Sequence, residues 1–287
     1  MNTIKKILVP VDLSDTALHT VLYALEFAKE HQSHVEVFYS SAVPLVYGES
    51  AYFGDGFGAD NAAMMMQAYQ LENENAKEKL ELFKVNLEKH IKEKHLSLVP
   101  ISYNFEFGSA MADINVEAET NNSDLIICGI HDHEDPSRLV KGISEKLLRN
   151  ATTPVIAVPE QDHYTPIKNV AYATNFHKHT VEEVEQFLSF IKPFGAKTHC
   201  VHLGDMLNEQ QQMDANLKPY FKDNDAVDFH IVSSTTLNDG LEAFIKRHNI
   251  DALALHPHRP AIWNQLFGKN RLESILQHTN VPVITVH

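Results

Sequence analysis

The chain has 287 residues, of which 44% are hydrophobic, and its formal net charge is -14 at pH 7. The length suits two domains of ordinary size, and the apolar fraction is enough to give each domain its own core. The negative charge argues against nucleic acid and against anionic membrane surfaces, because both bind basic protein faces. No apolar run approaches the roughly 20 residues that span a bilayer.

The N-terminus and the cysteines both favour the cytoplasm. Met1 is followed almost directly by a predicted strand, without the apolar segment and small-residue cleavage site of a signal peptide. Cys128 and Cys200 lie in separate apolar runs, which indicates reduced thiols in the core rather than a disulfide. We therefore expect a cytoplasmic protein with no membrane or nucleic-acid partner.

Predicted strands and helices alternate along the first half. The run 7–11 is continuously apolar, as expected of a strand that is buried on both faces, and Ser14 is placed to cap the helix that follows. An insert is expected near 44–75, irregular over 44–62, and it leads into a long helix. Further strands are expected at 35–39, 99–107, 125–128 and 155–158.

The second half repeats this order in less space. The segment that begins Lys5-Lys6-Ile7 is echoed 163 residues later by Lys168-Asn169-Val170, and the closing segment 154–158 is echoed by 282–286. Strands separated by helices imply right-handed crossovers and a parallel sheet. The strands of this half are expected near 170–173, 198–203, 229–232, 252–255 and 283–286.

The repeat predicts an α/β protein with two tandem doubly wound domains, each with five strands and with helices on both faces of the sheet. The expected boundaries are 1–159 for the first domain and 167–287 for the second. The polar segment 160–166 is the expected linker, because Pro159 precedes it and Pro166 ends it.

The loops after 7–11 and 125–128 are the candidate binding site, because doubly wound sheets bind ligands at strand carboxyl ends where the strand order reverses. The carboxylate of Asp12 can accept hydrogen bonds from a ribose hydroxyl or a base amine; the alternative is that it only caps the next helix. Gly129, after a strand, and Gly142, before a helix that begins near Ser144, can let backbone amides approach phosphates.

These segments resemble the universal stress proteins over nearly the whole chain, as two tandem copies. The resemblance rests on Val-Pro-Val-Asp-Leu-Ser at 9–14, on Ser-Asp-Leu-Ile-Ile-Cys-Gly at 123–129, and on Ser-Glu-Lys-Leu-Leu-Arg at 144–149 leading to Pro-Val at 154–155. It implies a stress-response binding or regulatory protein with a Rossmann-like, adenine nucleotide alpha-hydrolase-like fold and a five-stranded parallel sheet in each copy.

Members of this family commonly pair through the final strand. Here that implies an intramolecular pseudo-dimer through 155–158 and 283–286, and leaves open a homodimer of whole chains.

Many family members bind ATP through the aspartate after the first strand and a loop of the form G-x2-G-x9-G-[ST], whereas others lack this loop and do not bind ATP. In the first copy Asp12, Gly129 and Gly142 match this pattern, but Asp132 stands at the second glycine and Ile143 at the hydroxyl position. The resemblance implies a site for ATP or AMP, with Mg²⁺, in the first copy. Its residues are Pro10, Val11, Asp12, Gly129, Gly142 and Ser144.

The second copy departs further from the pattern. Asn175 replaces the aspartate, and His256, Arg259 and Lys269 stand where the three glycines belong. Side chains at glycine positions are expected to fill the groove, so the second copy is predicted to be degenerate. The rival hypothesis is that both sites are degenerate and that the protein is an interaction scaffold without nucleotide.

The 18 histidines include three His-x-His pairs, at 131/133, 177/179 and 256/258. On an extended segment i and i+2 side chains share a face, so each pair can supply half of a zinc site. No complete four-ligand set with a fixed spacing is present, and solvated loop histidines are the favoured interpretation. No metal site is therefore assigned, although a His-rich metal-binding stress protein remains an alternative.

The sequence shows no readable serine-histidine-acid or cysteine-histidine arrangement, so we expect no enzyme. Weak ATPase activity is left open.

Overall fold

The computed structural model describes residues 3–41, 59–107, 110–130, 143–160, 163–174, 180–203, 206–232, 237–256 and 279–286. Its strands are β1 (Lys6–Pro10), β2 (His34–Ser41), β3 (Ile101–Phe107), β4 (Leu125–Ile130), β5 (Val155–Pro159), β6 (Asn169–Ala173), β7 (Lys197–Leu203), β8 (Val227–Val232), β9 (Ala252–Leu255) and β10 (Val283–Thr285). Its helices are α1 (Asp15–His31), α2 (Ala59–Glu93), α3 (Ala110–Thr120), α4 (Ile143–Asn150), α5 (Thr180–Ile191), the short 3-10 helix η2 (Lys192–Phe194), α6 (Met206–Asn216), α7 (Lys218–Phe221) and α8 (Leu237–His248).

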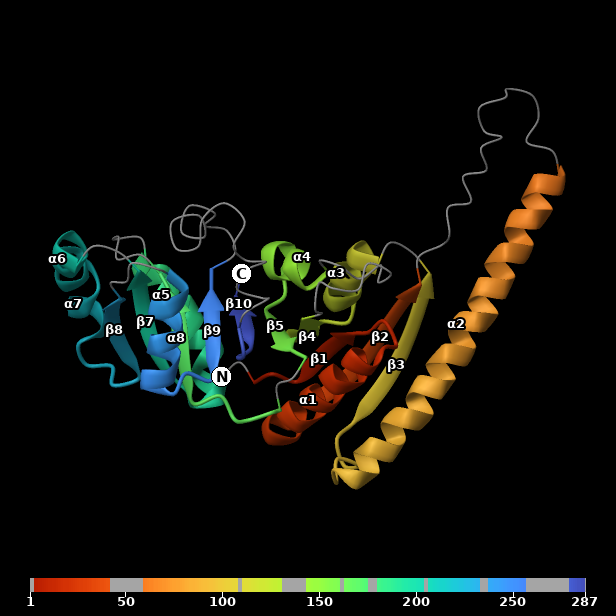
Figure 1. The fold of residues 1–287 in the computed structure, drawn as a ribbon, viewed down its shortest axis with the longest axis horizontal. Helices are drawn as coiled ribbons and strands as arrows, with labels where there is room; N and C mark the ends of the chain where they lie inside the picture. The colour runs from red at the N-terminus through yellow and green to blue at the C-terminus, as the bar shows by residue number, and fades with distance from the viewer. Residues whose placement is uncertain are drawn as a thin grey trace.

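These strands form one sheet with the order β3-β2-β1-β4-β5-β10-β9-β6-β7-β8 (Figure 1). The first five strands therefore have the order 3-2-1-4-5, and the last five repeat it from the other end of the sheet. Every strand pair within a half is parallel. The predicted fold of two tandem, doubly wound, five-stranded parallel sheets is confirmed.

The two halves meet where β10 pairs antiparallel with β5. Val283 lies opposite Ala157, Ile284 opposite Ile156, and Thr285 opposite Val155. The closing strands therefore pair with each other, as the final-strand contact implied by the family resemblance requires. Because this pairing is antiparallel, the parallel strands of the two halves run in opposite directions, and their carboxyl ends lie at opposite edges of the sheet.

Two core layers cover the two faces of the sheet. Alternate residues of a strand point to opposite faces, so Ile7 packs in the layer under α1 and α2, and Leu8 packs in the layer under α3 and α4. In the second half α5, α6 and α7 cover the first of these faces, and α8 covers the other. Each layer continues across the seam: Ile156 and Ile284 share one layer, and Val283 lies in the other.

Aromatic side chains extend the contact between the halves beyond the strand pair. Phe194 of η2 packs on Phe27 of α1, with ring centroids 5.4 Å apart. Tyr164, in the segment that joins the halves, packs edge-on against Tyr23 at 5.2 Å, and its hydroxyl donates a hydrogen bond of 2.5 Å to Glu30. The joining segment and the second half thus both pack on α1.

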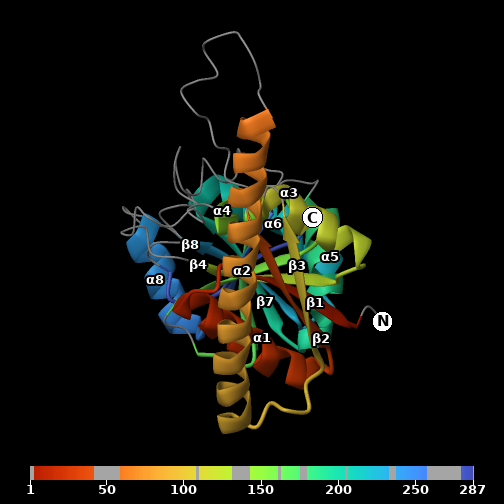
Figure 2. The ribbon, with the colours of Figure 1, turned by 90° about the vertical axis from the view of Figure 1, so that its right-hand side faces the viewer.

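The long helix α2 begins earlier than the sequence pattern predicts. It is continuous from Ala59, so residues 59–75 of the predicted insert are helical, whereas 42–58 lie outside the described residues. The segment after Ala59 is rich in Ala, Met, Gln, Leu and Glu, which are strong helix formers. The N-terminal part of α2 extends beyond the sheet, and Met66 is 64% exposed there (Figures 1 and 2). The C-terminal part buries an apolar stripe at helical spacing, formed by Ala76, Leu80, Phe83, Leu87 and Ile91.

Within the described ranges, none of the helices is long and apolar enough to cross a membrane.

The seam between β5 and β10 should be sensitive to cavities. Ile284 is completely buried there, so Ile284→Ala should lower the free energy of unfolding by about 2–5 kcal/mol, because it removes apolar contacts and leaves a cavity. Urea denaturation followed by circular dichroism measures the loss. Leu98→Ala, at a side chain that is 96% exposed, should change the same quantity by less than about 0.5 kcal/mol. Equal losses in the two variants would contradict the tight seam.

Candidate functional site

Asp12 lies at the point where the strand order of the first half reverses. Its strand, β1, is flanked by β2 on one side and by β4 on the other. The backbone N–H of Val11 donates to the carbonyl of Phe38 at 2.9 Å, which keeps the chain in the sheet for one residue beyond Pro10. Asp12 is the next residue, and Leu13 after it has a left-handed φ of 64° that turns the chain into α1. The strand-end position predicted for Asp12 is therefore observed.

The carboxylate of Asp12 is held by the start of α1. Its Oδ1 accepts hydrogen bonds from the Ser14 backbone N–H at 3.1 Å and from the Ser14 hydroxyl at 2.5 Å. Ser14 is the N-cap, and its Oγ accepts from the N–H of Ala17 at 3.2 Å. Asp12 thus supports the N-cap residue Ser14, which is the help in capping that the sequence left open as an alternative. The same contacts fix its carboxylate beside the positive end of the helix dipole.

Gly129 lies within β4 rather than after it. The pairing of β4 with β5 continues through Gly129 opposite Val158 and on to the next residue, so β5 holds the chain in the sheet past the predicted strand end. β1 and β4 pair with Leu8 opposite Ile126. Continuing this register by three residues places Val11 beside Gly129. The chain segments that carry Asp12 and Gly129 are therefore neighbours at the switch point, as doubly wound sheets require of a ligand site.

The remaining predicted site residues belong to the loop before α4 and to α4 itself. Gly142 lies outside the described residues, so its approach to a phosphate stays a prediction. Ile143 begins α4 and packs against the core, which explains why an apolar side chain stands at the family's hydroxyl position. Ser144 is the second residue of α4 and is partly exposed. Glu145 already places negative charge in the same first turn, where it receives a hydrogen bond from Arg149.

A second carboxylate approaches the first turn of α1. Glu160, directly after β5, accepts a hydrogen bond of 2.6 Å from the hydroxyl of Thr16. With Asp12 and with Asp15, the first residue of α1, three carboxylates therefore lie at the N-terminal turn of one helix. Such an edge suits groups that donate hydrogen bonds, such as ribose hydroxyls. A bare phosphate beside these charges needs a cation to balance it.

The equivalent edge of the second half is built differently. The N–H of Thr174 donates to the carbonyl of Val201 at 3.0 Å, which reproduces the contact of Val11 in the first half. The Thr174 carbonyl in turn accepts a hydrogen bond from His202 Nδ1 at 3.0 Å, and this imidazole is buried. His256 follows β9 directly, where the first half has Gly129. Asn175, Arg259 and Lys269 lie outside the described residues.

One group of side chains in the described part of the chain has the spacing of metal ligands, and the sequence analysis does not single it out. His199, His230 and His248 each offer a ring nitrogen within 4.8 Å of the others. None belongs to a His-x-His pair; of those pairs only His256 is described. The signal in the sequence is indirect: two histidines fall on neighbouring strands and the third ends a helix, so only the strand register brings them together.

The model of the universal stress protein family matches residues 3–159, more than half of the chain. The chain therefore belongs to the universal stress protein family. A universal stress protein from Archaeoglobus fulgidus DSM 4304 has a similar structure, with a TM-score of 0.58 and 18% identity over 99% of this chain and 96% of that one. A putative universal stress protein from Pseudomonas aeruginosa UCBPP-PA14 has a TM-score of 0.55 and 16% identity over 99% and 93%.

At these identities the similarities show a shared fold, which in both cases covers both halves of this chain. Comparison with the curated proteins finds no match.

The cap that orients Asp12 can be tested by stability. Ser14→Ala removes the acceptor of the Ala17 N–H and one of the two donors to Asp12, the hydroxyl, and should cost about 1 kcal/mol of unfolding free energy. Thermal unfolding measures the change. Ser189→Ala is the matched control, because among the described residues that exposed hydroxyl bonds the Glu185 carbonyl of its own helix and no other group. Its effect should stay within about 0.5 kcal/mol. A Ser14→Ala variant as stable as this control would argue against the capping contact.

Proposed function

We propose that this chain is a stress-response regulatory protein that binds an adenine nucleotide, ATP or AMP with Mg²⁺, at the β1–β4 edge of its first half. The observation that carries the proposal is the position of Asp12, which follows β1 at the switch point and is held beside α1 by Ser14. The proposed contacts are Pro10, Val11, Asp12, Gly129, Gly142 and Ser144.

Each proposed contact has a chemical role. The Asp12 carboxylate accepts hydrogen bonds from the ribose hydroxyls. The N–H of Val11 is already bonded to Phe38, so its carbonyl is the group that accepts from the adenine amine. Gly129 and Gly142 lack side chains and so leave room for the phosphates. Mg²⁺ balances the phosphate charge against Asp12 and Glu160.

The proposal confines nucleotide to the first half. In the second half a buried imidazole, His202, bonds the carbonyl that would otherwise face the adenine, and His256 stands where Gly129 leaves space. Residues 1–159 then form the nucleotide-binding domain, 160–166 the linker, and 167–287 a domain with a degenerate site. The assigned role is binding in the cytoplasm rather than catalysis, and phosphate release in the same samples would measure any weak ATPase activity.

Isothermal titration calorimetry with ATP, and separately with AMP, tests the site. Asp12→Ala should weaken binding by about 10- to 150-fold, because hydrogen bonds to a charged group contribute about 1.5–3 kcal/mol. Asp15→Ala removes the same charge from an exposed position three residues away, and should leave the affinity within about threefold, as expected of a screened surface charge. Circular dichroism checks that both variants are folded. Undiminished affinity in Asp12→Ala would remove the proposed adenosine contact.

The rival function is an interaction scaffold without nucleotide. It is favoured by the capping role of Asp12 and by Ile143, which packs in the core where the family's ATP-binding loop has a hydroxyl. A purified protein that carries no nucleotide and shows no thermal shift at millimolar ATP would support the scaffold. Nucleotide that copurifies with the wild type and is lost in Asp12→Ala would exclude it.

A further inference from the structure

The duplication gives each half a polar cluster at the same place in the fold, between the outer strands and one helix. His199 of β7 and Glu36 of β2 are equivalent positions, because they are separated by the same 163 residues as the two repeats. Asn104 lies opposite Phe38 in the β2–β3 pair, and His230 lies opposite Val201 in the β7–β8 pair. Because Phe38 and Val201 are themselves 163 residues apart, Asn104 and His230 are equivalent.

The third pair of equivalent positions lies at a helix end. In each half the helix before the fourth strand is followed by an asparagine with a left-handed backbone, Asn122 at φ 51° and Asn249 at φ 48°. The residues just before them, Asn121 and His248, are therefore equivalent. The three histidines of the second half thus replace Glu36, Asn104 and Asn121 of the first.

In the first half this cluster is a closed network. Glu36, only 5% exposed, accepts a hydrogen bond from Asn121 at 3.0 Å and pairs with the ammonium of Lys6 at 2.5 Å. Asn104 donates to Glu117 of α3 at 2.7 Å, and Asn121 donates to the same carboxylate. The carboxylates are thus supplied with donors from within the protein, and Lys6 balances the charge of Glu36.

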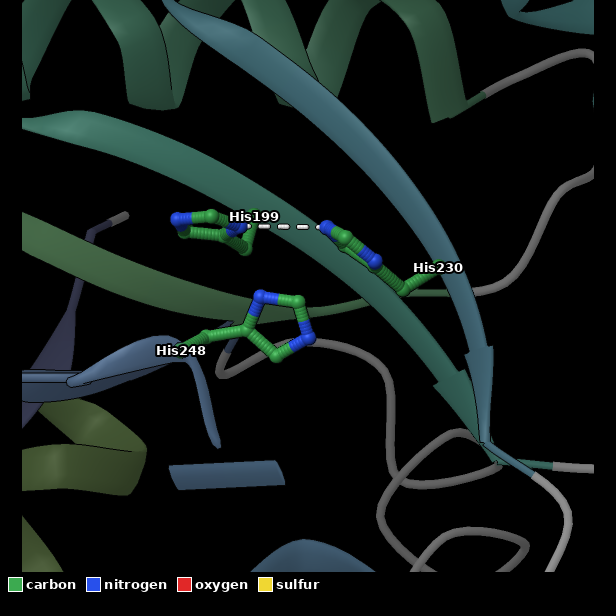
Figure 3. Close-up of side chains that lie close together, drawn as sticks. All are labelled: His199, His230 and His248. Atoms are coloured by element: carbon green, nitrogen blue, oxygen red, sulfur yellow. Dashed lines mark hydrogen bonds between the residues drawn. The ribbon is translucent and has the colours of Figure 1, made fainter. Parts of the chain in front are cut away.

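In the second half three imidazoles converge on one point. His199 Nδ1 and His230 Nε2 are 3.0 Å apart (Figure 3). The ring centroid of His248 lies 5.3 Å from that of His199 and 4.7 Å from that of His230. Phe244, one turn before His248 in α8, packs against all three rings. Pairing of β7 with β8 fixes the first two imidazoles, and the last residue of α8 supplies the third.

Two of the imidazoles, His199 and His230, are in the neutral state that a metal ion needs. Burial, followed by the neighbouring His199 and His248, lowers the pKa of His230 to about 4. Burial also holds the pKa of His199 below its usual value, although Asp228 acts in the opposite direction. At neutral pH both rings are therefore neutral, and each carries a lone pair. His199 Nε2 is buried and has no hydrogen-bond partner among the described residues. The hydrogen bonding of the second-half cluster is therefore less fully satisfied than that of the first-half cluster.

We propose that His199, His230 and His248 bind a borderline divalent cation, of which Zn²⁺ is the best match, with Asp228 or a water molecule as the fourth ligand. Zn–N bonds of about 2.0–2.1 Å in a tetrahedron place ligand nitrogens about 3.3 Å apart, close to the observed 3.0 Å between His199 and His230. When the ion binds, the proton of the His199–His230 hydrogen bond moves to the other nitrogen of the ring that donates it, so that His199 Nδ1 and His230 Nε2 both present lone pairs to the ion.

Two surrounding features favour a cation at this place. The Oδ2 of Asp228 lies 4.0 Å from His199 Nδ1, although it also pairs with Lys197 at 2.7 Å. The cluster also lies at the C-terminal end of α8, where the helix dipole is negative. The site has three fixed protein ligands and a fourth that is already shared with a lysine. It therefore resembles an open, exchangeable metal site more than a closed structural one.

Metal titration of the full chain tests this site, with any polyhistidine tag removed because a tag binds the same ions. After dialysis against a chelator, Zn²⁺ is titrated in competition with a chromophoric chelator, and Co²⁺ is added separately to read the coordination from its absorption spectrum. We expect one tight Zn²⁺ per chain and the intense visible bands of tetrahedral Co²⁺. His230→Gln and His248→Gln should each weaken Zn²⁺ binding at least about 100-fold, the most that loss of an outer-shell partner costs, and abolish the bands.

Two variants separate ligation from other effects. His90→Gln removes a partly exposed imidazole of α2 whose Nδ1 bonds the Asn86 carbonyl of its own helix, and should leave the tight site unchanged. Phe244→Leu disturbs the packing around the rings without removing a ligand, and should change the affinity less than about tenfold. Crystals of the wild type soaked in Zn²⁺ should show anomalous density between the three imidazoles, a result that needs no variant to fold.

The proposal is overturned if the wild type binds no Zn²⁺ more tightly than tens of micromolar. It is equally overturned if both glutamine variants fold and retain wild-type affinity, which would place the metal at other histidines. Neither outcome depends on nucleotide binding at the β1–β4 edge.

Discussion

The antiparallel pairing of β5 with β10 is the contact on which the rest of the architecture depends. It joins two five-stranded parallel sheets into one, so that both core layers run across the seam without interruption. Ile156 and Ile284, which lie opposite each other in the pair, are completely buried in one of these layers. β5 and β10 are the closing strands of the two halves. Because they pair with each other, they form the centre of the sheet rather than its edges.

The two halves share the side-chain hydrogen bonds that hold their first strands, and differ in the side chains at their candidate ligand sites. Asp124 accepts hydrogen bonds from two backbone N–H groups at the start of β1, and Asp251 does the same at the start of β6. These carboxylates satisfy backbone donors, so the duplicated fold requires both. Side chains at the strand carboxyl ends and beneath α3 and α8 are under no such requirement. There the halves have diverged. The first half has an aspartate bonded to the N-cap serine and a closed carboxylate network, and the second half has imidazoles at the equivalent positions.

How much the sequence predicts depends on whether a feature is local. Central strands such as β1 and β5 follow from continuous apolar runs, and the position of Asp12 follows from the end of such a run. Gly129 falls inside β4 because β5 offers it a partner, which the sequence of β4 alone does not show. The convergence of His199, His230 and His248 depends on strand register and on where α8 ends, and these are set by tertiary packing. Ser14 was predictable as a cap because capping is local, and its bond to Asp12, two residues away, belongs to the capping alternative that the sequence left open.

The seam also limits how this protein can assemble further. Within the sheet, β5 is flanked by β4 and β10, and β10 by β5 and β9, so both closing strands have neighbours on each side. Their backbone hydrogen-bonding edges are therefore saturated within the chain. A single-copy protein that pairs through its final strand uses that edge to recruit a second molecule. In this chain the edge is already occupied by the other half, so a homodimer of whole chains must be built on a different surface.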